Sequence, residues 1–269
     1  MATTRIAMIG AAGRMGRAIV RALGESPDAH LVAAVERPGS PDLGQDAGAL
    51  AGIGALGVVV QPHLPAAGDA DVWIDFSAPA SSVGNVRAAA ALGTRIVVGT
   101  TGLSSEDKQA VVVAARTIPV VLAPNTSVGV TVLLKLVADA ARALGPGYDI
   151  EVVETHHRAK RDAPSGTALR LAEAAAEATG RDLAEAARYA RHGDVGPRSP
   201  DEIGIQTLRG GDVVGDHTVF FLGLGERVEI THKASSRDVF ARGAVRAAEW
   251  LAGKGPGLYD MRDVLGLTT

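Results

Sequence analysis

The chain has 269 residues, a formal net charge of −3, no cysteine and an aromatic fraction of only 3%. The absence of cysteine excludes disulfides, a thiolate nucleophile and Cys-ligated metal centres, and the small net charge provides no general attraction to nucleic acid or anionic membranes. No apolar run approaches the roughly 20 residues that cross a bilayer, and we recognise no signal peptide before the first strand, so we expect a cytoplasmic globular protein.

The first half of the chain alternates between short apolar runs and helix-length segments. The apolar runs predict strands at residues 5–9, 31–35, 72–76, 95–98 and 119–123. Helical spacing of Met15, Ile19, Ala22 and Leu23 predicts a helix after the first strand, and helices are also expected at 82–92 and 106–115. Strands separated by helices in this way predict βαβ units and a parallel sheet.

The second half has a different pattern, typical of an α+β domain. It predicts helices at 128–144, 167–178 and 239–251, a strand at 150–154 and a polar, irregular segment at 182–200. Three further strands are expected at 203–208, 212–222 and 227–232. The Gly-containing turns at 209–211 and 223–226 indicate that these three strands run antiparallel.

A glycine-rich turn joins the first strand to the first helix. The segment from Gly10 to Gly16 has the spacing G-x-x-G-x-x-G, and Glu36 follows Gly16 at the end of the second strand. Such a turn lets a pyrophosphate approach the backbone and a helix N-terminus, while an acidic residue at this position binds the adenosine ribose. Arg37 is placed to meet a 2′-phosphate. The alternative is a structural turn followed by a solvated Glu–Arg pair, and we favour the dinucleotide site.

Two further loops follow strands of the same sheet. Residues 99–102 read Gly-Thr-Thr-Gly after the fourth strand, and residues 123–126 read Ala-Pro-Asn-Thr after the fifth. Ligands of open α/β sheets bind beyond the carboxyl ends of the strands, so both loops are candidates for the nicotinamide end of a dinucleotide. Ordinary turns are the alternative.

The segment 154–168 combines cations with the start of a helix. Five potentially cationic residues lie within 156–161, and the sequence Pro-Ser-Gly-Thr follows at 164–167. Cations beside the N–H groups of a helix N-terminus form a site for a small dianion. A solvated basic loop is the alternative. The adjacent pair His156-His157 has poor spacing for chelation, so we expect no metal.

Several motifs resemble those of the dihydrodipicolinate reductase family. They include GAAGRMGR near the N-terminus, GTTG at 99–102, PNTSVGV at 124–130, ETHHRAKRDAPSGTA at 154–168, HKASSR at 232–237 and GLYDMRDVL at 257–265. The resemblance covers nearly the whole chain in order. It implies reduction of the dehydrated form of 4-hydroxy-tetrahydrodipicolinate to tetrahydrodipicolinate with NADPH or NADH, in lysine and diaminopimelate biosynthesis.

The resemblance also implies an α/β fold with two domains. A Rossmann-like, parallel-sheet domain would comprise residues 1–127 and be completed by 239–269. An α+β domain with an open mixed sheet, residues 128–238, would bind the substrate and form a homotetramer. Two other functions stay open, namely another NAD(P)-dependent imine or amino-acid dehydrogenase and a non-catalytic NADP sensor. A sensor has no need of a His/Lys cluster beside a helix N-terminus.

The resemblance assigns residues by position. His156 and Lys160 match the acid/base pair, with the division of proton transfer between them left open. Residues that match substrate contacts are His157, Lys160, Ser165, Gly166 and Thr167. Residues that match cofactor contacts are Gly10, Ala11, Ala12, Gly13, Arg14, Met15, Glu36, Arg37, Gly99, Thr100, Thr101, Ala123, Pro124, Asn125 and Thr126. The sequence departs from frequent family residues at Ala78, Thr126 and Ala159, which leaves the preference between NADH and NADPH undecided.

Overall fold

The computed structural model describes residues 3–267, which divide into two compact units. The first unit contains the chain up to Val128 together with the segment from Arg237 onward, and the second unit is Gly129–Ser236. The sequence analysis placed these limits at 127/128 and 238/239. None of the helices in the described part of the chain is long and apolar enough to span a membrane.

The first unit contains a seven-stranded parallel sheet in the order β12-β6-β5-β4-β1-β2-β3. Its central strands are short, apolar and buried on both faces, as parallel strands between two helical layers must be. The predicted parallel sheet is therefore confirmed. The strands are β1 (Thr4–Ile9), β2 (Ala29–Val35), β3 (Val60–Gln61), β4 (Val72–Asp75), β5 (Arg95–Val98), β6 (Pro119–Leu122) and β12 (Gly257–Tyr259).

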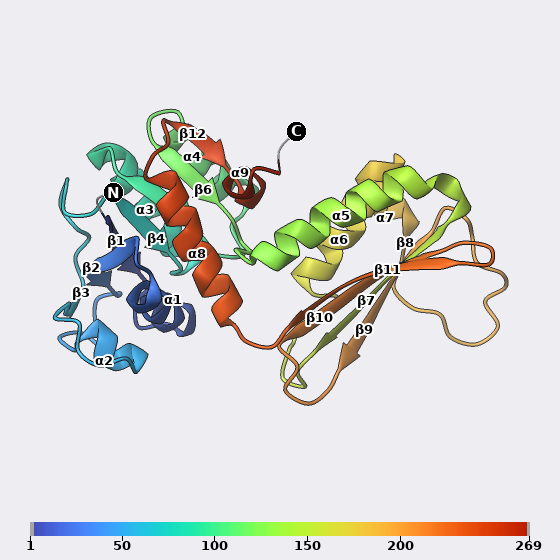
Figure 1. Cartoon of the computed structure of the whole chain (residues 1–269), viewed down its shortest axis with the longest axis horizontal. Coiled ribbons are helices and arrows are strands. Elements are labelled where there is room, and N and C mark those ends of the chain that lie inside the picture. Colours follow the sequence, from blue (N-terminus) through green and yellow to red (C-terminus); the bar gives the residue numbers. More distant parts are fainter. Residues whose placement is uncertain (1–2, 268–269) are drawn as a thin grey trace. The chain divides into compact units, whose positions relative to one another are not determined.

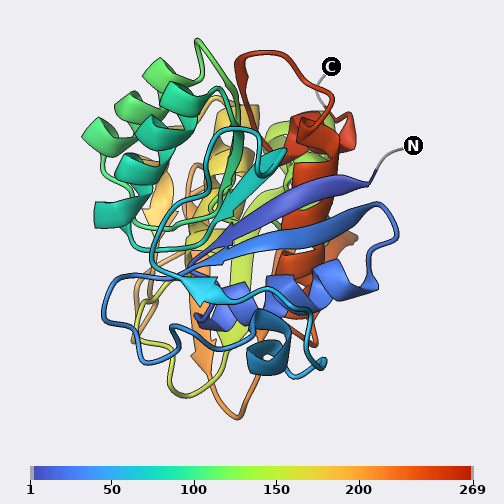
Figure 2. The same ribbon diagram turned by 90° about the vertical axis from the view of Figure 1, so that its left-hand side faces the viewer.

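Helices cover both faces of this sheet (Figure 2). One apolar core joins the sheet to α1 (Arg14–Glu25), α2 (Ala47–Ala51), α8 (Asp238–Leu251) and α9 (Met261–Leu265). The other core joins it to α3 (Pro79–Leu92) and α4 (Ser105–Ala114). Gly243 of α8 lies so close to the chain after β6 that an added Cβ would be 1.7 Å from the Thr126 carbonyl oxygen. The C-terminal segment thus completes the first unit.

The second unit contains a mixed five-stranded sheet in the order β11-β10-β7-β9-β8. Helices α5 and α6 pack on one face and form a single apolar core with it (Figure 1). In β7 and β10 half-buried residues alternate with buried ones, so the other face is open. The elements are α5 (Val128–Leu144), a 3₁₀ turn (Gly145–Gly147), β7 (Asp149–His156), α6 (Gly166–Thr179), α7 (Leu183–Ala186), β8 (Ala187–Arg188), β9 (Ile203–Arg209), β10 (Gly215–Leu222) and β11 (Arg227–Ala234).

Two predictions for this unit were wrong in part. Strands β9 and β10 run in opposite directions as predicted, but they do not pair with each other, because β7 lies between them, parallel to β9 and antiparallel to β10. The connection 210–214 passes over the end of β7, where Gly210 N–H donates to the His156 carbonyl. The segment 182–200 is not wholly irregular, because Asp182 caps the short helix α7 and β8 follows it.

Candidate functional site

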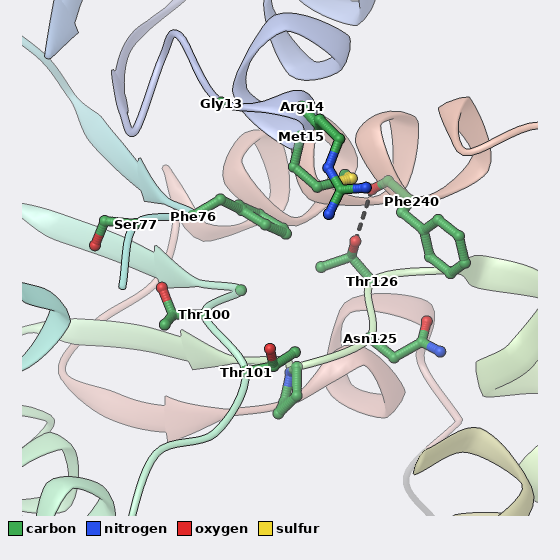
Figure 3. Close-up of a pocket in the computed structure, with 12 residues that line it drawn as sticks. Gly13, Arg14, Met15, Phe76, Ser77, Thr100, Thr101, Asn125, Thr126 and Phe240 are labelled. Carbon is green, nitrogen blue, oxygen red and sulfur yellow. Dashed lines mark hydrogen bonds between the residues drawn. The ribbon is translucent and has the colours of Figure 1, made fainter. Parts of the chain in front are cut away.

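A cavity of about 390 Å³ lies in the first unit, beside the carboxyl ends of β4, β5 and β6 (Figure 3). The N-terminus of α1, the chain segments that follow the three strands and one residue of α8 (Asp238–Leu251) line it. Predicted cofactor residues in the lining are Gly13, Arg14, Met15, Gly99, Thr100, Thr101, Pro124, Asn125 and Thr126. The structure therefore brings together three segments that are distant in the sequence.

Other cofactor candidates lie outside this lining, namely Gly10, Ala11, Ala12, Glu36, Arg37 and Ala123. Conversely, Phe76, Ser77 and Phe240 line the cavity although the sequence analysis did not assign them to the cofactor. Phe76 and Ser77 directly follow β4, so the carboxyl-end rule applied to the other loops would have found them. No sequence signal indicated Phe240. Its backbone carbonyl oxygen accepts a hydrogen bond from the Thr126 hydroxyl, and the two oxygens are 2.6 Å apart (Figure 3).

The glycine turn requires its glycines. Gly10 has a φ of +82°, and a Cβ there would lie 2.6 Å from the Phe76 carbonyl oxygen. A Cβ on Gly16 would lie 2.1 Å from the Gly10 carbonyl oxygen. Gly13 is the N-cap of α1, and no side chain caps this helix. The N-terminus of α1 is therefore left without the side-chain acceptor that most helices carry, as an anion-binding helix needs.

Glu36 extends from the end of β2 to the glycine turn. Its Oε2 accepts the N–H of Ala12 at 3.2 Å, and its Oε1 accepts the N–H of Arg37 at 3.0 Å. The side chain of Arg37 is exposed. The structure thus places the Glu36 carboxylate against the turn, and Arg37 is the next residue in the chain.

A buried carboxylate fixes the turn after β4. Asp75 is fully buried and accepts hydrogen bonds from the Ser82 hydroxyl, from the Ser77 N–H at 3.0 Å and from Asn85 Nδ2 at 3.4 Å. Burial raises the pKa of Asp75 although these donors oppose the shift. The network holds the chain at Phe76 and Ser77, which line the cavity.

In the second unit, Glu154 and His156 project from the same face of β7. The strand continues two residues beyond its predicted end, so His156 belongs to the strand rather than to the basic loop. Residues two apart in a strand share a face. Accordingly, His156 Nδ1 lies 2.5 Å from Glu154 Oε2.

Glu154 is 0% exposed and is surrounded by donors. Arg209 donates to both of its oxygens, at 2.8 and 2.9 Å, Ser165 N–H donates at 3.0 Å and the Thr207 hydroxyl at 3.2 Å. Burial opposes the charge of this carboxylate, but the hydrogen bonds from Arg209 and His156 outweigh it and hold the pKa of Glu154 below its ordinary value. The side chain is therefore an ionised acceptor.

A second histidine lies beside His156. The rings of His156 and His217 meet edge to face with centroids 5.1 Å apart, and His217 Nε2 is 3.1 Å from the Ser165 hydroxyl. Burial and the neighbouring His156 lower the pKa of His217 to about 4, so this ring is neutral. Burial also lowers the pKa of His156, although Glu154 opposes the shift. Sequence reasoning missed Glu154, Arg209 and His217 as members of this cluster.

The basic loop and the start of α6 hold the remaining predicted residues. Lys160 Nζ contacts both oxygens of Asp162, at 2.8 and 2.9 Å. His157 is half-buried, and the Ser165 hydroxyl caps α6 by accepting the N–H of Ala168. Of the backbone N–H groups expected to face a ligand at this helix N-terminus, that of Ser165 is excluded, because it already donates to Glu154.

Gly166 is the first residue of α6, followed by Thr167. A Cβ added at Gly166 would meet no atom within 4 Å, so open space lies over this end of the helix. Arg158 and Arg161 are exposed, which fits a solvated loop at those two positions. Within residues 3–267, no group of three or more His, Cys, Asp or Glu side chains is arranged to hold a metal ion.

Comparison with protein-family models identifies both halves of the chain. The model described as dihydrodipicolinate reductase, N-terminus, matches residues 4–126, and the model described as dihydrodipicolinate reductase, C-terminus, matches residues 129–265. The 4-hydroxy-tetrahydrodipicolinate reductase of Anaeromyxobacter dehalogenans strain 2CP-1 is 60% identical over 98% of each chain. That of Alkalilimnicola ehrlichii is 56% identical over 98% of this chain and 100% of the relative.

Solved structures give the same result at the level of the fold. The dipicolinate-bound dihydrodipicolinate reductase from Paenisporosarcina sp. TG-14 aligns with a TM-score of 0.77 and 25% identity, covering 96% of this chain and 97% of that one. An amine dehydrogenase from Mycobacterium smegmatis aligns with a TM-score of 0.58 and 16% identity, covering 95% and 94%. The second likeness shows a shared fold alone.

Proposed function

The chain belongs to the dihydrodipicolinate reductase family, and on that premise we propose that it reduces 4-hydroxy-tetrahydrodipicolinate, through its dehydrated form, to tetrahydrodipicolinate. The cofactor is NADPH or NADH, and the reaction belongs to lysine and diaminopimelate biosynthesis. The observation that carries this proposal is the 60% identity to a reductase of this name over 98% of both chains.

The first unit fits the cofactor. Its cavity lies beside the carboxyl ends of parallel strands, and the N-terminus of α1 offers N–H groups without a side-chain cap. The close approaches at Gly10 and Gly16 pack the turn tightly against neighbouring backbone, and a tight glycine turn that leads into a helix N-terminus is the form that binds a pyrophosphate. We assign the fifteen predicted residues, from the glycine turn to Thr126, to this role. When bound, the nicotinamide supplies a hydride.

The second unit supplies charge and a proton. We propose that His157, Lys160, Ser165, Gly166 and Thr167 bind the carboxylates of the substrate. Lys160 contributes a cation and α6 the positive end of a helix dipole. The Ser165 N–H is occupied by Glu154, and its hydroxyl contacts the Ala168 N–H and His217 Nε2, so this residue binds the substrate by exchanging one of these partners. His156 holds a proton beside this site, and Lys160 stabilises negative charge in the transition state.

Oxidation of NADPH in the presence of the pathway substrate tests this function. His156→Gln should lower kcat by about a hundredfold, the usual scale of general acid catalysis, and leave NADPH affinity unchanged in calorimetry. His192→Gln is the matched control, because this histidine is exposed in the loop after β8. A parent chain that oxidises no NADPH with this substrate would contradict the function, and a His156→Gln variant with normal kcat would contradict the assignment.

We also propose that the protein is a homotetramer located in the cytoplasm. The open face of the second unit's sheet supports assembly, because it leaves Val153, Phe220 and Leu222 partly exposed in neighbouring strands. Light scattering coupled to size-exclusion chromatography measures the mass directly, and a monomer of 27.4 kDa in solution would contradict the tetramer.

A further inference from the structure

The carboxylate of Glu154 lies against one ring nitrogen of His156, and this contact determines what the ring can do. We propose that Glu154 is a positioning residue that keeps the proton of neutral His156 on Nδ1, so that Nε2 is the nitrogen that exchanges a proton with the substrate. The statement about Nδ1 rests on the structure alone, and the statement about the substrate rests on the proposed function.

The first step of the argument is the ionisation of Glu154. A carboxylate that is 0% exposed is stable as an anion only if donors replace its water. Arg209 donates to both oxygens at 2.8 and 2.9 Å, and Ser165 N–H and the Thr207 hydroxyl add two more bonds to Oε1. An ionised carboxylate is an acceptor only, so the hydrogen between Oε2 and His156 Nδ1, 2.5 Å apart, belongs to the histidine.

The second step concerns the other ring nitrogen. Within residues 3–267, no hydrogen-bond partner contacts Nε2 of His156, and the side chain retains 11% exposure. A Cβ at Gly215 would lie 3.0 Å from Nε2, so the glycine leaves space beside this atom. Because Nδ1 is committed to Glu154, Nε2 is the nitrogen left to titrate and to meet a ligand.

The third step is the charge balance around the ring. Burial is the main cause that disfavours the imidazolium, Glu154 of β7 favours it, and Lys160 in the basic loop and Arg209 at the end of β9 also disfavour it. His217 of β10, the remaining titratable neighbour, is neutral. Glu154 is therefore the group that allows His156 to take up a proton in a buried, cationic environment.

Glu154→Gln gives a sharp test because the geometry orients the amide. Three donors converge on Oε1 and one arginine N–H, from Arg209 Nη1, on Oε2. The amide oxygen therefore takes the position of Oε1, and the NH₂ group takes that of Oε2 and displaces Arg209 Nη1 from it. The NH₂ then donates to Nδ1 of His156, which forces the proton of the neutral ring to Nε2. Glu151→Gln is the matched control, since Glu151 lies in the same strand, also pairs with arginines and faces the opposite side of the sheet.

The experiment records two-bond ¹H–¹⁵N spectra of the full-length, ¹⁵N-histidine-labelled protein without substrate, with His156 assigned from His156→Gln. We expect the Nδ1–H tautomer in the parent and in Glu151→Gln, and the Nε2–H tautomer in Glu154→Gln. Glu154→Asp, which keeps the charge, should keep the parental tautomer. A parent chain with its proton on Nε2 overturns the proposal without any variant, so a Glu154→Gln chain that fails to fold does not remove the test.

Kinetics test the second statement. In Glu154→Gln we expect kcat to fall by about a hundredfold and the alkaline limb of its pH profile to move to lower pH, because the imidazolium loses its anionic partner. NADPH affinity should equal that of the parent. Parental kcat together with the altered tautomer would overturn the role of Nε2. A parent chain with the Nδ1–H tautomer and no turnover would instead contradict the proposed function.

Discussion

Arg37 directly follows Glu36, the residue whose carboxylate contacts the glycine turn. The two carboxylate oxygens of Glu36 accept hydrogen bonds from the backbone N–H groups of Ala12 and Arg37. The Arg37 side chain is exposed. An acid at this position binds ribose hydroxyls, and an arginine beside it binds a 2′-phosphate. The two side chains together predict that both NADH and NADPH bind.

Arg37→Ala should separate the two cofactors. The variant loses a charge-assisted partner of the 2′-phosphate, so NADPH should bind roughly tenfold more weakly, a change of about 1.4 kcal/mol, while NADH affinity stays within twofold. Calorimetric titration of each cofactor measures this. Arg116→Ala is the charge-matched control, because Arg116 is exposed and precedes the amino end of β6, whereas Arg37 follows the carboxyl end of β2 in this parallel sheet. Equal weakening of both cofactors in Arg37→Ala would remove Arg37 from 2′-phosphate recognition.

The types and spacing of the residues predicted one part of the site and missed another. Glycine spacing predicted the tight turn at Gly10. The structure gives the reason for glycine there, since a positive φ and the contact with Phe76 tolerate no side chain. Glu154 was missed because its importance depends on a strand two residues longer than its apolar run. Arg209 was missed because it reaches Glu154 from a strand 55 positions away. Partners that distant leave no local pattern.

The start of α6 is the element that joins charge and backbone donors in one segment. Lys160 contacts Asp162 on the exposed side of the loop, and Gly166 begins the helix with open space over it. The Asp162 side chain is 63% exposed and the Lys160 side chain 20%. A pair with one solvated partner contributes little to stability, so Lys160 can exchange Asp162 for a substrate carboxylate at small cost.

Lys160→Ala and Gly166→Val should each weaken binding of pyridine-2,6-dicarboxylate to the NADPH complex. The first removes a cation and the second places a side chain where a carboxylate must approach the backbone. We expect more than a tenfold loss, the effect of one charge-assisted hydrogen bond of about 1.5–3 kcal/mol. Lys233→Ala, at an exposed position of β11, controls for charge. Parental affinity in both variants would place the dicarboxylate site elsewhere.

Helices and strands were predictable where the pattern that specifies them lies within their own residues. Helix α5 has the predicted bounds because its apolar period is long and Gly145-Pro146-Gly147 ends it. The order of β9, β7 and β10 was not predictable, since partner choice within a sheet depends on side chains from distant segments. The short strands β3 and β12 were missed because two or three residues show no period.

At the scale of the whole molecule, the chain leaves the first unit after Val128 and returns to it at Arg237. Helix α8, which follows this return, packs in the same apolar core as α1, and its backbone at Gly243 lies against the backbone of Thr126. Both tryptophans, Trp73 in β4 and Trp250 in α8, lie in this unit. Tryptophan fluorescence therefore reports the unfolding of the first unit separately from that of the second.

Gly243→Ala should destabilise the first unit. The added methyl would lie 1.7 Å from the Thr126 carbonyl oxygen, and because this neighbour is backbone, α8 itself must shift. Overpacking of this kind costs about 3 kcal/mol, so the urea midpoint of tryptophan fluorescence should fall. NADPH should bind more weakly, since Thr126 lines the cavity and donates to Phe240 of α8. Gly253→Ala is the matched control, because its methyl meets no atom within 4 Å. If both variants unfold at the parental midpoint, the packing of α8 on the chain after β6 does not stabilise this unit.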